Sequence, residues 1–143
     1  MASADDAIIL GEHAQALGGY PHARRAGDFV YLCGTSCRRQ DNTHEGVTIH
    51  EDGSTTLDIY VQTQAVMRNI QRILAAAELT LDHVIDVTSF LVSMDDFEGY
   101  NRAYNEFFQG PTGPTRTTLA VAALPHPNLL VELKVVAYAP QDR

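Results

Sequence analysis

The sequence predicts an α+β fold in which two helices cover one face of a single mixed sheet. Two stretches have apolar residues at helical spacing, and several short apolar runs are rich in β-branched residues, which is typical of strands. Their order is strand, strand, helix, strand, helix, strand, strand, and such an order packs both helices on one sheet. The 143 residues correspond to one domain, which we place at 20–143 after an irregular arm at 1–19.

The first two strands precede a long loop. Short runs flank Gly27–Asp28, a pair typical of turns, and the second run at 29–33 is apolar throughout, as in a strand covered on both faces. Residues 34–54 are polar and punctuated by glycine, with room for a short strand at 47–49. Long loops in compact domains often carry function.

Residues 58–77 form the clearest predicted helix. Glutamine and arginine lie opposite one apolar stripe, which consists of Leu57, Val61, Ala65, Ile70, Ile73, Leu74 and Ala77. Thr55 with Asp58 three residues later resembles a capping box, so we expect these two residues to begin the helix.

A strand, a second helix and two strands complete the predicted fold. Residues 84–92 are rich in β-branched residues, and Ser93 with Asp96 opens a helix. The loop 110–114 ends this helix, because proline cannot continue it. Its apolar side consists of Phe97, Tyr104, Phe107 and Phe108. Strands at 116–123 and 129–138 follow.

The last strand is apolar at nearly every position. Two helices cannot cover both faces of such a sheet, so we expect a symmetric oligomer to cover the other face. Glu132 lies inside this strand, where an unpaired carboxylate is costly, so it needs an arginine partner or a water-filled cleft.

Charge and composition exclude several classes of function. Ten Lys and Arg against 18 Asp and Glu give a net charge of -8, which disfavours binding to nucleic acid or an anionic membrane. A role in RNA cleavage also lacks an aromatic and basic stripe. The only lysine is Lys134, so any Schiff-base or pyridoxal chemistry would have to use it.

The expected location is the cytoplasm. The chain begins with an acidic segment unlike a signal peptide, and no apolar run reaches the ~18 residues of a membrane span. Cys33 and Cys37 are too few for a disulfide framework. The six histidines form no zinc-binding pattern, so we expect no metal.

Arg116 and Glu132 are the main candidate site residues. Arg116 begins a strand between hydroxyl-bearing threonines, and its planar fork matches a carboxylate, although a surface arginine is the alternative. Glu132 is either a general base, whose pKa burial raises toward neutral pH, or one half of a structural ion pair. Arg38 and Arg39 form a cationic spot that either is simply solvated or grips a second anionic group.

Four further positions have a plain structural alternative. Tyr20 either lines a cleft or packs, and Cys33 at a strand end is more typical of a buried small residue than of a nucleophile. Gly34 begins a bend that lacks the helix of a phosphate-binding loop. His126 lies between two prolines, which is more typical of a loop residue than of a catalyst.

The chain resembles the YjgF/YER057c/UK114 family, also called Rid, from about Tyr20 to Ala139. The matching residues are Gly19-Tyr20, Leu32-Cys33-Gly34, Asp96-Phe97, Asn101, Tyr104, Phe107-Phe108, Gly113 to Arg116, Leu124-Pro125 and Val131-Glu132. The resemblance implies a trimer, alone or paired with a second trimer, with a chorismate-mutase-like fold and clefts between subunits. It also implies hydrolysis of enamines and imines without a metal or cofactor.

The resemblance also implies roles for single residues. Arg116 matches the arginine that grips the substrate carboxylate, and Glu132 matches the acidic residue associated with the attacking water. Tyr20 and Asn101 match positions that line the cleft. Two residues depart from the family: Cys33 replaces a common serine and Thr118 a common cysteine, which changes the shape of the pocket.

Residues 34–43, 113–118 and 124–127 are similar to the 2-aminomuconate deaminases. That similarity implies a small dicarboxylate substrate. From the charge of this substrate we expect Arg38 or Arg39, alone or with His126, to hold its distal carboxylate. A generalist deaminase of 2-aminoacrylate-like intermediates and a non-catalytic protein that binds small carboxylates are the alternatives.

Overall fold

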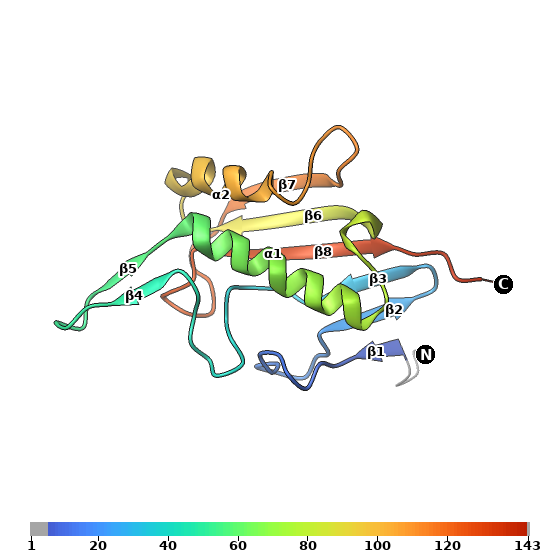
Figure 1. The fold of residues 1–143 in the computed structure, drawn as a ribbon, viewed down its shortest axis with the longest axis horizontal. Coiled ribbons are helices and arrows are strands. Elements are labelled where there is room, and N and C mark those ends of the chain that lie inside the picture. The colour runs from blue at the N-terminus through green and yellow to red at the C-terminus, as the bar shows by residue number, and fades with distance from the viewer. Residues whose placement is uncertain (1–5, 143) are drawn as a thin grey trace.

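The computed structural model describes residues 6–142, which form a six-stranded sheet with both helices on one face (Figure 1). The sheet consists of β1 (Ala7–Ile8), β2 (Ala23–Ala26), β3 (Phe29–Leu32), β6 (Val84–Leu91), β7 (Thr115–Ala120) and β8 (Val131–Tyr138). The helices are α1 (Ile59–Ala76) and α2 (Phe97–Tyr104). A separate hairpin of β4 (Val47–Ile49) and β5 (Thr55–Leu57) projects from the body of the protein. The predicted α+β class is therefore confirmed.

The spatial order of the strands is β1-β2-β3-β8-β6-β7, so the last strand lies in the middle of the sheet. Strand β8 is antiparallel to both of its neighbours, whereas β6 and β7 run parallel. A parallel pair needs a crossover connection, and the segment that contains α2 supplies it. The sheet is therefore mixed, as expected.

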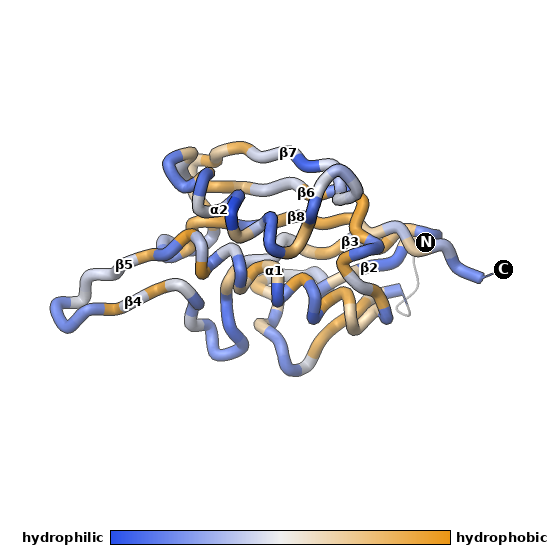
Figure 2. The backbone as a smooth tube through the Cα atoms, turned by 45° about the horizontal axis from the view of Figure 1, so that its top comes forward, coloured by the Kyte–Doolittle hydropathy of each residue, from blue (hydrophilic) through white to orange (hydrophobic). Residues whose placement is uncertain are grey.

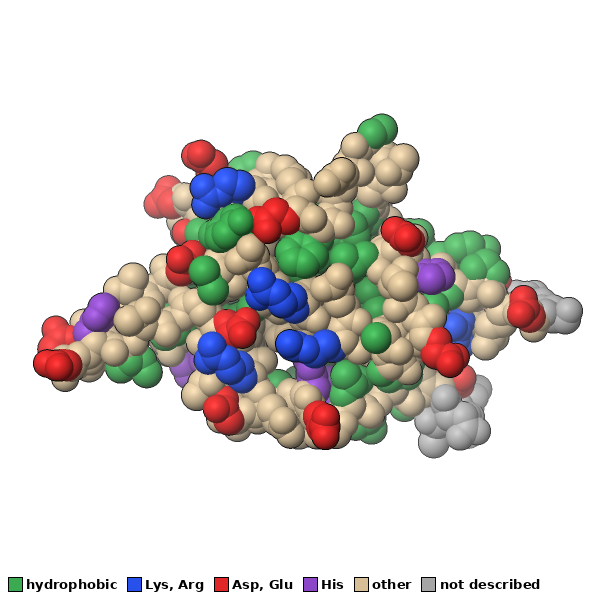
Figure 3. All heavy atoms as spheres, viewed as in Figure 1, with side chains coloured by type: hydrophobic (Ala, Val, Ile, Leu, Met, Phe, Trp, Pro, Cys, Tyr) green, Lys and Arg blue, Asp and Glu red, His purple; other side chains and the backbone are tan. Residues whose placement is uncertain are grey.

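The two faces of β8 differ in burial. Its residues alternate between buried and half-buried, and the buried set on the helix side is Val131, Leu133, Val135 and Ala137. The core continues into α1, which lies along the sheet and carries alternating hydrophobic and hydrophilic residues (Figure 2). Its buried apolar residues are Ala65, Val66, Met67, Ile70, Ile73 and Leu74, whereas Val61 of the predicted stripe is exposed. The opposite face, which we call the open face, carries exposed aromatic side chains at Phe29, Tyr31 and Tyr138. The helix side of the protein carries interspersed basic and acidic side chains on its surface (Figure 3).

The start of α1 corrects one expectation. Asp58 is the N-cap, and its Oδ1 accepts the amide of Val61 at 3.1 Å. Thr55 is not part of the cap, because it belongs to β5 and pairs with Ile49 of β4. The expected capping box at Thr55 and Asp58 is therefore wrong.

The second helical segment is also shorter and more divided than expected. Ser93 caps a 3-10 turn, Met94–Asp96, through an Oγ that accepts the amide of Asp95 at 3.1 Å, and α2 follows. The helix ends at Tyr104, and Phe108 then packs into the core from a turn. The strands expected at 116–123 and 129–138 are observed at Thr115–Ala120 and Val131–Tyr138.

The N-terminal arm is held against the body of the protein. Its strand β1 pairs Ala7 with Arg24 and Ile8 with Ala23. Residues 1–5 of the expected arm lie outside the described residues. Within the described part, no helix is both long and apolar enough to cross a membrane.

Candidate active site

The structure divides the predicted site residues between the two faces of the sheet. Arg116 lies opposite Val87, whose side chain is buried on the helix side, whereas Glu132 lies opposite Phe90 on the open face. We call the first group the arginine half-site (Asn101, Arg116 and Thr118). We call the second the glutamate half-site (Tyr20, Cys33, Gly34 and Glu132).

In the arginine half-site, Arg116 lies beneath α2. Its Nη1 donates to Asn101 Oδ1 at 2.8 Å, and its Cζ lies 4.7 Å from the centroid of the Tyr104 ring. The remaining N–H donors border a surface cavity of about 390 Å³. No carboxylate of residues 6–142 forms an ion pair with Arg116. A guanidinium that keeps free donors beside a cavity is suited to bind an anionic group.

The tyrosines of α2 support this arginine. Tyr100 hydroxyl lies 2.5 Å from Ser89 Oγ and 3.4 Å from Thr118 Oγ1, which places Thr118 beneath the helix. Tyr104 hydroxyl is buried and has no hydrogen-bond partner among the described residues. Burial raises the pKa of Tyr104 to about 12, so the hydroxyl stays protonated. Sequence reasoning placed Tyr104 only in the core, although its spacing from Asn101 puts both on one side of the helix.

In the glutamate half-site, Glu132 lies against the start of the long loop. A Cβ atom added to Gly34 would lie 3.1 Å from Glu132 Cδ and 3.3 Å from each carboxylate oxygen. The loop is held there because Thr35 exchanges both backbone hydrogen bonds with Leu133, at 2.9 and 3.0 Å. Glycine at position 34 therefore allows the backbone to approach the carboxylate closely.

Desolvation raises the pKa of Glu132 above its ordinary value. Lys134, two residues further along the same face, donates to the backbone carbonyl of Leu32 and forms no ion pair with Glu132 within the described chain. Glu132 borders a cavity of about 410 Å³ that opens on this face. A carboxylate with a raised pKa beside a cavity is suited to take a proton from water.

The other residues of the glutamate half-site line the same cavity. Tyr20 is exposed, and its hydroxyl accepts the amide of Leu17 at 3.2 Å. Burial raises the pKa of the Cys33 thiol, which keeps it protonated at neutral pH. Tyr20, Cys33 and Gly34 also line a second, smaller cavity, which is therefore a neighbour of the first.

The structure separates the three residues expected at a distal carboxylate. Arg38 lines the smaller cavity, next to the glutamate half-site. Arg39 faces the loop surface, where its Nε lies 3.7 Å from Glu45 Oε1. His126 stacks on His44 with ring centroids 4.4 Å apart. Of the three, Arg38 alone borders the cavities that adjoin Glu132.

Comparison with known proteins places this fold in a family. A family model described as endoribonuclease L-PSP matches residues 11–139. The solved structure of YyfA from Yersinia pestis, a member of the conserved Rid family, covers 93% of the chain and 98% of its own, with TM-score 0.76 and 28% identity. The chain belongs to the YjgF/YER057c/UK114 (Rid) family.

Two Rid-family relatives match most of the chain in sequence. A RutC family protein of Pyrococcus horikoshii is 36% identical over 92% of the chain and 96% of its own length. The 2-iminobutanoate/2-iminopropanoate deaminase of Dermatophagoides farinae is 30% identical over 85% of the chain and 87% of its own. The resemblance to the Rid family is therefore confirmed, and the family includes a protein named as an imine deaminase.

The described part of this Rid chain offers no cluster of three or more His, Cys, Asp or Glu side chains that could hold a metal ion. Its chemistry-bearing groups are instead an arginine, a desolvated carboxylate and tyrosine hydroxyls. Such a set can bind an anion and move a proton to or from water. Metal-free and cofactor-free chemistry remains a prediction.

Proposed function

We propose that the protein is a 2-aminomuconate deaminase, which hydrolyses the enamine or imine of its substrate to 4-oxalocrotonate and ammonia. The observation that carries this proposal is the pair of Arg116, which has no ionic partner among residues 6–142, and Glu132, whose pKa is raised by desolvation. Both belong to a Rid-family chain with an imine deaminase among its relatives.

The proposal requires a neighbouring subunit. Arg116 and Glu132 lie on opposite faces of one sheet, so a single chain does not present both to one substrate. A symmetric trimer that covers the open face would bring the arginine half-site of one subunit to the glutamate half-site of the next. The exposed aromatic residues of the open face, Phe29, Tyr31 and Tyr138, support such an interface.

The reaction then follows from the two half-sites. Arg116 holds the carboxylate beside the amine-bearing carbon, and tautomerisation of the enamine to the imine makes this carbon electrophilic. Glu132 takes a proton from water as the water oxygen attacks that carbon. The C–N bond of the carbinolamine then breaks as its hydroxyl becomes the carbonyl. The nitrogen leaves as ammonia and carries both protons of the water, one of them passed on by Glu132. Arg116 stabilises the negative charge of the substrate carboxylate throughout the reaction.

A dicarboxylate substrate is supported by the position of Arg38. This cation lines the smaller cavity, which shares Tyr20, Cys33 and Gly34 with the cavity at Glu132. A second candidate function is generalist deamination of small 2-imino acids, which the named activity of the Dermatophagoides farinae relative favours. The two functions differ in whether the enzyme uses the second carboxylate of the substrate for binding.

A substrate panel tests the proposal. The purified protein is given 2-aminomuconate and, separately, 2-iminopropanoate generated in place, and ammonia is measured. We expect kcat/KM to be higher for the dicarboxylate and to fall at least about 100-fold in Arg116→Ala, since an oriented charged contact is lost. Equal or better rates on 2-iminopropanoate support the generalist instead. A protein that releases no ammonia from either substrate is not a deaminase.

A further inference from the structure

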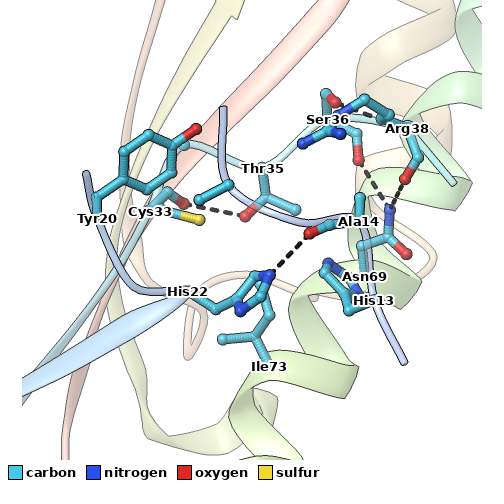
Figure 4. Close-up of a pocket in the computed structure, with 12 residues that line it drawn as sticks. His13, Ala14, Tyr20, His22, Cys33, Thr35, Ser36, Arg38, Asn69 and Ile73 are labelled. Atoms are coloured by element: carbon cyan, nitrogen blue, oxygen red, sulfur yellow. Dashed lines mark hydrogen bonds between the residues drawn. The ribbon is translucent and has the colours of Figure 1, made fainter. Parts of the chain in front are cut away.

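A small cavity lies beneath the N-terminal arm, between residues 13–16, the loop after β3 and helix α1 (Figure 4). Its volume is about 40 Å³. A cavity of roughly 10–15 Å³ holds one water molecule, so this cavity has room for a carboxylate group. It shares the lining residues Tyr20, Cys33 and Gly34 with the larger cavity at Glu132, so the two cavities are neighbours.

His13 lies on the wall of this cavity and has free hydrogen-bonding capacity among the described residues. Its side chain is 7% exposed, and neither ring nitrogen takes part in a hydrogen bond within residues 6–142. The neighbouring His22 is fully used, because its Nδ1 accepts the amide of Leu10 at 3.1 Å and its Nε2 donates to Ala14 O at 2.8 Å. The His13 nitrogens are not among the fully buried unpaired atoms of the described residues, so they stay accessible to a ligand in the cavity.

His13 offers its N–H without a charge of its own. Burial, reinforced by His22, Arg72 and Arg38, lowers the pKa of His13 to about 4. The ring is therefore neutral at pH 7 and carries one N–H donor and one acceptor. An anion in the cavity would accept from that N–H.

Arg38 supplies the positive charge. Its guanidinium donates to Asn42 Oδ1 and to Gln15 O, each at 2.6 Å, which leaves three of its five N–H donors. No carboxylate in the described residues pairs with it, and the residues that line the cavity include no Asp or Glu. Arg39, by contrast, already faces Glu45.

We propose that this cavity binds the second carboxylate of an extended dicarboxylate substrate through Arg38 and His13. The assignment rests on the proposed function, in which the first carboxylate lies on Arg116 and the reacting carbon lies at Glu132. A second carboxylate beside Glu132 would meet a like charge, whereas the small cavity offers donors and no acidic side chain. The cavity thus selects dicarboxylates over monocarboxylates of the same length.

A matched pair of ligands tests the proposal without turnover. Hexa-2,4-dienedioate and hexa-2,4-dienoate have the same carbon skeleton and differ in one carboxylate, and neither carries an amine that could be hydrolysed. Their dissociation constants are measured by calorimetry for the wild type and for Arg38→Met, His13→Gln and Arg39→Met. The last variant removes the same charge from the adjacent residue and is the control.

We expect the wild type to bind the dicarboxylate about 10- to 100-fold more tightly, the range of a charged hydrogen-bonded contact. Arg38→Met should abolish this preference, His13→Gln should reduce it about 10-fold, and Arg39→Met should keep it. Equal binding of both ligands by the wild type overturns the proposal, as does a preference that survives Arg38→Met or disappears in Arg39→Met. His13→Gln provides an independent test if Arg38→Met does not fold.

The outcome is separable from that of the deaminase proposal. A dicarboxylate preference that depends on Arg38, in a protein that releases no ammonia, supports the cavity assignment and contradicts the function. Ammonia release from 2-aminomuconate without any dicarboxylate preference in binding supports the function and contradicts the cavity assignment.

Discussion

At the scale of single residues, function and stability conflict at Glu132. Desolvation raises the pKa of this carboxyl in the folded protein, so ionising it costs stability. This loss of stability is present at pH values above the raised pKa of the folded state. It disappears as the pH falls below the pKa of the unfolded state, because the carboxyl is then protonated in both states. The group that the proposed reaction needs ionised is thus one that the fold resists ionising.

Replacing Glu132 by glutamine should therefore stabilise the fold and abolish the reaction. We expect Glu132→Gln to have a higher Tm than the wild type at pH 7, and this gain should disappear by about pH 4. Thermal unfolding across this range, with Glu51→Gln in the exposed hairpin as the control, checks the stability. The kcat/KM of the wild type should fall at low pH with a midpoint above the ordinary glutamate value. A Tm that decreases in Glu132→Gln at pH 7 contradicts this account.

Gly34 gives a second prediction at this scale, because a methyl group there would press on the Glu132 carboxylate. The added Cβ would lie 3.1 Å from Glu132 Cδ, so the carboxylate has to move by a few tenths of an ångström. Gly34 lies outside the positive-φ region, so the alanine itself is unstrained. We expect Gly34→Ala to lower kcat about 10-fold with little change in Tm. Gly11→Ala, which meets nothing within 4 Å, should leave both unchanged.

At the scale of elements, local patterns predicted the regular structure better than its boundaries. The apolar stripe predicted a helix at 58–77, and the structure has Ile59–Ala76. Thr55 and Asp58 have the spacing of a capping box, yet Thr55 pairs with Ile49 of β4, six residues upstream, and so belongs to a hairpin. The aromatic spacing likewise predicted a helix that continues past Tyr104, where α2 ends. Phe108 fits the apolar pattern of a helix because it packs into the core, although it lies outside α2.

The sequence proposes members for the candidate site, which stay a prediction, but it does not give their arrangement. The motifs around Arg116 and Glu132 identified both residues. Their placement on opposite faces depends on how β6 pairs with β7 and β8, a register set by contacts between distant segments. His13 has no sequence signal, because only the folded arm brings it beside Arg38.

The corrected start of α1 makes a prediction about stability. Asp58 caps the helix through Val61, and Thr55 contributes no cap hydrogen bond. Asp58→Ala should therefore lower the free energy of unfolding by about 1 kcal/mol, a typical cost of a lost cap. Urea unfolding measures this, and Thr55→Ala should cost clearly less because its side chain is exposed. If Asp58→Ala and Thr55→Ala lowered the free energy of unfolding equally, Thr55 would contribute to the cap and the corrected helix start would be wrong.

At the scale of the whole molecule, the open face and the divided site have one explanation. The exposed aromatic residues need a cover, and the glutamate half-site needs an arginine. A ring of subunits would supply both at each boundary, since a heterologous contact would bring the helix-side edge of one chain to the open face of the next.

Mixed oligomers test this arrangement directly. Arg116→Ala and Glu132→Gln subunits should each be inactive alone, because every boundary then lacks one half-site. When the two are unfolded together and refolded in equal amounts, a boundary is intact wherever Arg116 of a Glu132→Gln subunit meets Glu132 of an Arg116→Ala subunit. Random assembly makes this about one boundary in four, so ammonia release should recover to about a quarter of the wild-type rate. If one chain supplied both residues of a site, no mixture would recover activity, and the subunit-boundary site would be wrong.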